Sequence, residues 1–182
     1  MKNDIRFYLE KYLHENLKEK VLKLYESVND DLNFWPASIK YHHNFIGGLY
    51  QHTLEVIEYA LRMYDAFEEE FKKKLVLKSD VVLLAFVHDL EKIGKYVENK
   101  DYNSEEFKPN VYEFKYNYSK IDMNDCAQVV RICAKYGIIL NDRQLNAITF
   151  AHGGWSLDKG DMLSLAAIIH MADLFSITIN AK

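Results

Sequence analysis

Residues 83–92 read LLAFVHDLEK, an apolar run that ends in a histidine and an aspartate. With apolar residues at i, i+3 and i+4 and His88 at i+7, the run predicts a helix whose buried stripe includes His88. The apolar members of this stripe are Val81, Leu84 and Ala85. Asp89 follows beside His88 and is expected near the core as well. A buried carboxylate without a partner is costly, and binding to a cation offsets that cost.

Two other stretches also combine apolar residues with histidine or aspartate: HHNFIGGLYQHTLEV at 42–56 and IIHMADLF at 168–175. His52 follows Gly48 on the predicted inner face of one helix, and Asp173 lies on the inner face of another. Imidazole nitrogen and carboxylate oxygen together favour Mn, Fe, Co, Ni or Zn, whereas Mg prefers oxygen ligands. Each residue also has a structural alternative. His88 fits a core histidine, His52 a helix cap, and Asp173 a partner of Arg131 or Arg143.

The composition is that of an ordinary globular domain. The chain has 182 residues, 49% of them hydrophobic, and a formal net charge of −4, so no overall basic charge indicates nucleic-acid binding. Cys126 and Cys133 lack a CxxC pattern and are expected to be reduced, which favours the cytoplasm. The charged N-terminus does not resemble a signal peptide, and no apolar run is long enough to span a membrane. A homo-oligomer is compatible with the sequence.

Helical patterns dominate, so we predict an all-α bundle. One amphipathic helix is expected from Ile5 to about Val28, within an N-terminal segment 1–30. The other helices are predicted from about Gly48, from Ser79 (as N-cap) to about Lys92, and over 123–136, 142–151 and 161–179, the last with Asp161 as cap. Aromatic residues alternate with polar ones over 112–118, which predicts a small β-ribbon or flap near residues 97–120.

The order His52, His88-Asp89, Asp173 resembles the H…HD…D pattern of the HD-domain superfamily of metal-dependent phosphohydrolases. The resemblance covers about 34–176, and the whole chain, 1–182, is then expected to form one HD domain. The run PASIKYHHNFIGGLYQHT, with AHGGW and IIHMADLF, is most similar to the HD module of YhaM-type 3′-to-5′ exoribonucleases. The resemblance implies a compact helical bundle with the site at its centre.

It also implies roles for individual residues. His52, His88, Asp89 and Asp173 would hold one divalent metal. Asp89 would orient the nucleophilic water, and Lys92 would offset phosphate charge, although a solvated lysine fits this position equally well. One of His42 and His43 would bind substrate phosphate, with the other packed or exposed. His152 and His170 would hold a second metal, orient ligands or donate a proton to the leaving group. His14 lies outside the resemblance and is expected at the surface.

Two departures from the superfamily pattern affect the metal count. Glu91 occupies the position at which many HD proteins have glycine, where it would alter the mouth of the site or bind a cation. No histidine occurs between Leu90 and Phe150, and Ala151-His152 stands where related sequences have two histidines. One metal is therefore expected rather than two.

Three functions are compatible with these residues. The first is hydrolysis of a phosphoester or phosphoanhydride bond in a nucleotide or short oligonucleotide. The second is 3′-to-5′ trimming of single-stranded RNA or DNA in a cationic, aromatic groove. That groove would comprise Lys95, Lys100, Lys108, Lys115 and Lys120 with Tyr112, Tyr116 and Tyr118. The third is a regulatory HD module that binds nucleotide with little turnover.

Overall fold

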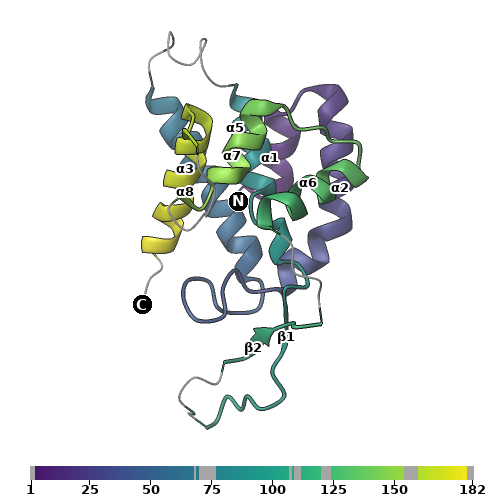
Figure 1. The fold of residues 1–182 in the computed structure, drawn as a ribbon, viewed down its shortest axis with the longest axis vertical. Coiled ribbons are helices and arrows are strands. Elements are labelled where there is room, and N and C mark those ends of the chain that lie inside the picture. Colours follow the sequence, from purple (N-terminus) through teal and green to yellow (C-terminus); the bar gives the residue numbers. More distant parts are fainter. Residues whose placement is uncertain are drawn as a thin grey trace.

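Helices pack into a bundle, and a short two-stranded ribbon extends from one end of it (Figure 1). The computed structural model describes residues 3–67, 69, 77–106, 108, 112–119, 124–153 and 160–179. The predicted mainly helical fold with a small β flap is confirmed.

The N-terminal segment forms two helices, α1 (Ile5–Tyr12) and α2 (Glu15–Phe34), so the prediction of one continuous helix is wrong. The chain is extended at Leu13, whose side chain is buried, and α1 packs against both α2 and α5. Because of the break, the apolar faces of both helices reach the core. Asp4 caps α1 by accepting a hydrogen bond from the Phe7 amide, and His14 is exposed as expected.

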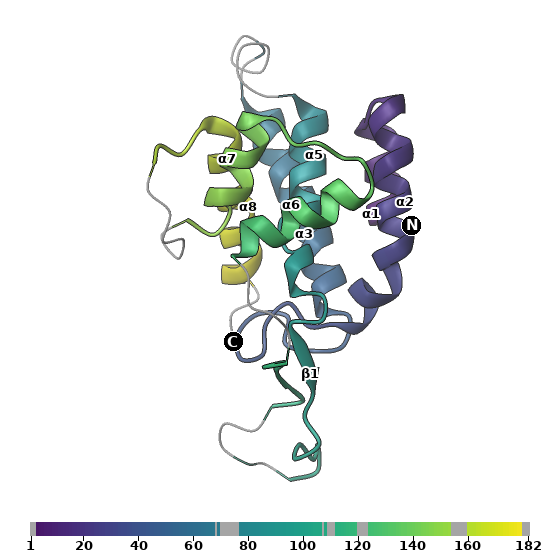
Figure 2. The same cartoon turned by 45° about the vertical axis from the view of Figure 1, so that its right-hand side comes forward.

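Three helices form the centre of the bundle: α3 (Gly48–Ala66), α5 (Lys78–Val87) and α8 (Ser164–Ile179). Figure 2 shows α5 between the other helices, and all of its residues from Val81 to Val87 are buried. A helix that is apolar on all sides is stable only inside a core. The central position of α5 therefore carries His88, the residue after its last turn, to the middle of the bundle.

Two predicted boundaries around these helices are wrong. The helix predicted to reach Lys92 ends at Val87, and a 3₁₀ turn, η1 (Leu90–Lys92), follows it. The same helix, α5, starts at Lys78, so Ser79 is not its N-cap. Helix α8 starts at Ser164 rather than after Asp161. Asn146 bonds the Asp161 carbonyl and the Leu163 amide, which holds the preceding segment against α7.

The remaining helices, α6 (Asp125–Lys135) and α7 (Asp142–Phe150), match their predicted ranges closely, although the predicted start at Met123 lies outside the described residues. Asn124 caps α6, and Asn141 with Gln144 forms a capping box on α7. Cys126 and Cys133 lie on α6 as free thiols, as expected. No helix within the described ranges combines the length and apolar character that a membrane span requires.

The ribbon pairs β1 (Tyr96–Glu98) with antiparallel β2 (Phe114–Tyr116). Phe114 is buried and contacts the rings of Phe34 and Trp35 at the end of α2, with ring centres 6.0 Å apart in each case. These contacts anchor the ribbon at the same end of the bundle as the loop that leads into α3 (Figure 1).

Candidate metal centre

His52 lies on α3, and its side chain is buried beside the loop that carries His42 and His43. This close approach depends on Gly48, because a Cβ there would lie 2.0 Å from the His43 carbonyl oxygen. The neighbouring Gly47 has φ +79°, a conformation that glycine adopts easily. The ring centres of His42 and His43 lie 4.8 and 5.3 Å from that of His52. The paired glycines thus let three histidines gather at the start of one helix.

The side chain of His88 points its Nε2 atom into the same cluster. Its Nδ1 atom lies 2.8 Å from the Ala85 carbonyl oxygen, which can only accept, so Nδ1 carries the proton. Burial lowers the pKa of His88 to about 4, so the ring is neutral and Nε2 has a lone pair.

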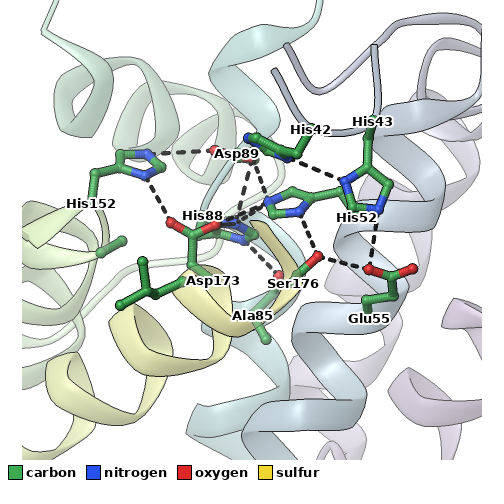
Figure 3. A network of polar contacts seen from close by, with 12 residues as sticks. His42, His43, His52, Glu55, Ala85, His88, Asp89, His152, Asp173 and Ser176 are labelled. Atoms are coloured by element: carbon green, nitrogen blue, oxygen red, sulfur yellow. Dashed lines mark hydrogen bonds and ion pairs between the residues drawn. The ribbon is translucent and has the colours of Figure 1, made fainter. Parts of the chain in front are cut away.

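A relay of hydrogen bonds from Glu55 through Ser176 likewise keeps the proton of His52 on Nδ1 (Figure 3). The Ser176 hydroxyl donates to Oε2 of Glu55 at 2.8 Å and therefore accepts from Nδ1 of His52 at 3.0 Å. Nε2 of His52 is left to face Nε2 of His88 at 3.4 Å. Two imidazole lone pairs this close repel each other unless a cation or a proton lies between them.

Two carboxylates complete this first cluster. Oδ2 of Asp89 and Oδ1 of Asp173 each lie 3.1 Å from Nε2 of His52. Burial would raise the pKa of Asp173, but hydrogen bonds from His152 and His52 hold it well below its usual value. Within the described part of the chain Asp173 has no arginine partner, and Arg131 instead bonds Gln128. His52 does not cap α3 either, because the cap position is Gly47.

The donor set fits a metal ion. His52, His88 and Asp173 each offer one ligand atom, and these atoms lie within 4.8 Å of one another. The pKa of His52 is raised because the hydrogen bonds and negative charges of Asp173 and Asp89 outweigh burial. The carboxylates of Asp173 and Asp89 thus favour a positive charge at the position that a metal would take. Nitrogen and carboxylate ligands suit a divalent transition metal.

Lys92 is largely buried, so the alternative of a solvated lysine is wrong. Its Nζ atom lies 2.5 Å from Oδ2 of Asp89, and its side chain is 13% exposed. Burial would lower the pKa of Lys92, but the charges of Asp89 and Glu91 raise it above its usual value. The ammonium group therefore remains positive beside the predicted ligand Asp89.

His42 and His43 are both buried. Nε2 of His43 donates to Oε2 of Glu55 at 3.1 Å, and the two Nδ1 atoms lie 3.2 Å apart. Burial, together with the positive charges of His52 and Lys92, lowers the pKa of His42 to about 3. Neutral His42 can exchange hydrogen bonds with a phosphate but cannot neutralise its charge.

The histidines after α7 have different surroundings. Nδ1 of His152 lies 3.4 Å from Oδ2 of Asp173, and its Nε2 lies 3.4 Å from Oδ1 of Asp89. Burial opposes protonation, but the Asp173 hydrogen bond and the charge of Asp89 raise the pKa of His152 to about 9. His170 instead bonds the Ala151 carbonyl through Nδ1, at 3.0 Å, and covers Gly153, where a Cβ would come within 2.3 Å of its ring. Only His152 is therefore brought to the metal cluster.

Two residues in this network, Glu55 and Ser176, were not predicted from the sequence. Glu55 lies one turn after His52 on α3, and Ser176 lies one turn after Asp173 on α8. Hydrogen bonds from His43, Gln51 and Ser176 outweigh burial and lower the pKa of Glu55 to about 2. Helical spacing from the predicted ligands would have indicated both residues.

Three of the five lysines of the predicted nucleic-acid groove have acidic partners, and Lys100 is exposed. Lys95 pairs with Asp125 at 3.0 Å, Lys108 with Glu106 at 3.2 Å and Lys115 with Asp101 at 3.8 Å. Lys120 lies outside the described residues. These pairings reduce the positive charge that such a groove would offer to a nucleic-acid strand.

Comparison with known proteins gives one partial relative. The chain is 38% identical, over 66 residues, to the dihydroneopterin 2′,3′-cyclic phosphate phosphodiesterase of Methanocaldococcus jannaschii. The match covers 36% of this chain and 26% of that protein, so the chain spans about a quarter of the relative's length. No family model matches the chain. No solved structure matches it either.

Proposed function

We propose that this protein is a metal-dependent phosphohydrolase of the HD superfamily, which cleaves a phosphoester or phosphoanhydride bond in a nucleotide or short oligonucleotide. The observation that carries the proposal is the 3.4 Å contact between the Nε2 atoms of His52 and His88, flanked by Asp89 and Asp173. The partial relative, named as a cyclic phosphate phosphodiesterase, supports a phosphate diester as one substrate class.

In this proposal His52, His88, Asp89 and Asp173 would hold the metal, which when bound would supply a water of lowered pKa and polarise the phosphate. Ser176 and Ala85 keep both imidazole protons on Nδ1, so the ligand lone pairs are preorganised. Asp89 orients the attacking water beside the metal position. No ligand atom has to change its tautomer before catalysis.

The residues around this cluster are assigned to the substrate. Lys92 stays charged and offsets the negative charge of the phosphate while it contacts Asp89. His42 exchanges a hydrogen bond with a phosphate oxygen, and His152, which is 28% exposed, serves the leaving-group side. Substrate contact by His43 or His170 has weaker support, since these rings bond Glu55 and the Ala151 carbonyl.

The test is hydrolysis by Mn-supplemented protein, comparing the parent with Asp89→Asn. The panel comprises 2′,3′-cyclic nucleotides, nucleoside triphosphates, and short single-stranded RNA and DNA. Asp89→Asn preserves the shape of the side chain but removes its charge, so we expect an intact fold and a loss of turnover by roughly 10²-fold or more. Glu98→Gln, an exposed change of the same kind, is the control.

The panel also separates the other hypotheses. Turnover of RNA or DNA strands that weakens steeply with salt would favour the 3′-to-5′ exonuclease, including the YhaM type. Tight nucleotide binding without turnover would favour the regulatory module. Parent-like activity in Asp89→Asn would refute the proposed site.

A further inference from the structure

Helix α8 is apolar on its outer side as well as on its inner side. Among its residues only Asp173 is an Asp, Glu, Lys or Arg, and Asp173 is buried in the metal cluster. The helix packs against α3, α5 and α7 at the edge of the bundle (Figure 1). A helix that is apolar all round is normally buried, as α5 is. The outer side of α8 therefore lacks the charged residues that a solvent-exposed helix face usually carries.

The exposed apolar residues of α8 and of the turn before it form one stripe, which we call the α8 stripe. Its members, each 43–59% exposed, are Leu163, Met171, Leu174, Phe175 and Ile179. Spacings of three, four and eight residues place them along one face of a helix. The Ala167 amide donates to the Leu163 carbonyl at 2.9 Å, so the helical geometry reaches back to Leu163. The α8 stripe is thus continuous over the length of the helix.

The area of the α8 stripe is close to what a stable protein interface needs. If each large apolar residue has a surface of roughly 200 Å², the five members expose about 500 Å² together. A standard interface buries about 800 Å² on each partner. Neighbouring residues extend the surface onto α3, where the Tyr59 ring lies 6.2 Å from that of Phe175 and the Arg62 guanidinium lies 5.7 Å from the Tyr59 ring. Aromatic residues, Met and Arg are the types enriched in interfaces.

The charge of this surface favours a second copy of the same chain as the partner. In a two-fold dimer the same patch of each copy meets itself, so a charged patch would face its own charge. The members of the α8 stripe carry no charge, and two copies of it can therefore meet without repulsion. Two helices that pack side by side through apolar faces also interlock their side chains as ridges and grooves.

We propose that the α8 stripe is the interface of a homodimer, in which a second copy of this chain covers α8 about a two-fold axis. The inference assigns a surface to the homo-oligomer that the sequence allows, and it goes beyond the proposed function because it needs neither metal nor substrate. Since α8 also carries Asp173 and Ser176 on its inner side, the dimer would hold both residues in place against α3.

The experiment is sedimentation equilibrium of the metal-free protein over a wide range of concentrations. We expect the parent to reach twice the mass of one chain. Leu174→Lys and Met171→Lys each place an unpaired charge at the centre of the interface, so the dissociation constant should rise by roughly 10²-fold or more. The control is Ile139→Lys, an 81% exposed residue that lies beside α2, where Lys20 donates to the Gly137 carbonyl. This variant should dimerise like the parent.

Each other outcome would overturn the proposal. A parent that stays monomeric at every concentration leaves the α8 stripe to another partner, and a dimer that persists in both α8 variants lies on another surface. A monomeric parent that binds vesicles of phosphatidylcholine and phosphatidylserine assigns the stripe to a membrane surface. Equal loss of the dimer in Ile139→Lys shows an effect of added charge rather than of position. These results are independent of turnover, so they leave the proposed function untouched.

Hydrogen exchange of the parent gives a test that needs no variant. Peptides from α8 should exchange more slowly at high protein concentration than at low concentration, because the dimer protects them from opening. Exchange of α8 that is the same at both concentrations, in a parent that dimerises, would place the interface elsewhere. The proposal therefore stays testable even where a lysine at position 171 or 174 prevents folding.

Discussion

Nδ1 of His52 and Oγ of Ser176 lie 3.0 Å apart and join α3 to α8 across 124 residues of sequence. Ser176 donates its own proton to Glu55, so it can only accept from His52. The contact therefore directs Nε2 of His52 toward Asp89 and Asp173.

Loss of this contact should weaken metal binding without disrupting the fold. Ser176→Ala leaves His52 free to adopt the other tautomer, and the loss of such a partner typically reduces metal affinity by about 10–100-fold. The Mn²⁺ dissociation constant, measured by titration calorimetry, gives the result. Thr178→Ala is the control, because this residue of α8 is exposed and its hydroxyl donates to the Leu174 carbonyl one turn earlier. Equal affinities for Ser176→Ala and the parent would contradict the relay.

Metal should stabilise the folded protein. At a free Mn²⁺ concentration about 100 times the dissociation constant, the expected gain is about 2.7 kcal/mol. For a chain of this length, that gain corresponds to a rise in melting temperature of about 5–10 °C, measured by differential scanning calorimetry. Asp173→Asn removes a charged ligand with little change of shape and should abolish most of the rise. A full rise in this variant would place the metal elsewhere.

Metal-free protein should become less stable as the pH rises from about 6.5 to about 9. The folded-state pKa of His152 is raised to about 9, so its protonated form stabilises the fold fully below its unfolded pKa. This contribution is lost as the pH passes through the folded value. Urea unfolding with a chelator present should show a fall of about 1–3 kcal/mol, and a smaller fall in His152→Gln. Identical pH profiles for the two proteins would exclude a role for His152.

The ion pair between Lys92 and Asp89 should matter most when metal is absent. Lys92→Met keeps the aliphatic stem but leaves a buried carboxylate without its ammonium partner, a change that typically costs about 3–5 kcal/mol. Because a metal also neutralises Asp89, Mn²⁺ should restore more stability to Lys92→Met than to the parent. Chemical denaturation with and without Mn²⁺ tests this. An equal gain in stability from Mn²⁺ in both proteins would show that the Lys92 ammonium group and the metal act on Asp89 independently.

Sequence reasoning predicted the helical fold, the ribbon and the inward orientation of His52, His88 and Asp173. These predictions rest on helical and strand periodicity, which neighbouring residues determine. The same reasoning failed at Leu13, where burial of two apolar faces interrupts a periodic pattern, and at Val87, after which the chain leaves the α-helix.

By itself, then, the sequence determined the helical elements and the inward faces that carry His52, His88 and Asp173, because these follow from local periodicity and hydrophobicity, but it left the burial of Lys92 and His42 open. Only the tertiary structure decided how those side chains pair: Ser176 with His52, His152 rather than His170 with Asp173, and Oδ1 of Asp89 with His152. Such pairings depend on the packing of helices that are distant in sequence, and periodicity within one helix carries no information about that packing.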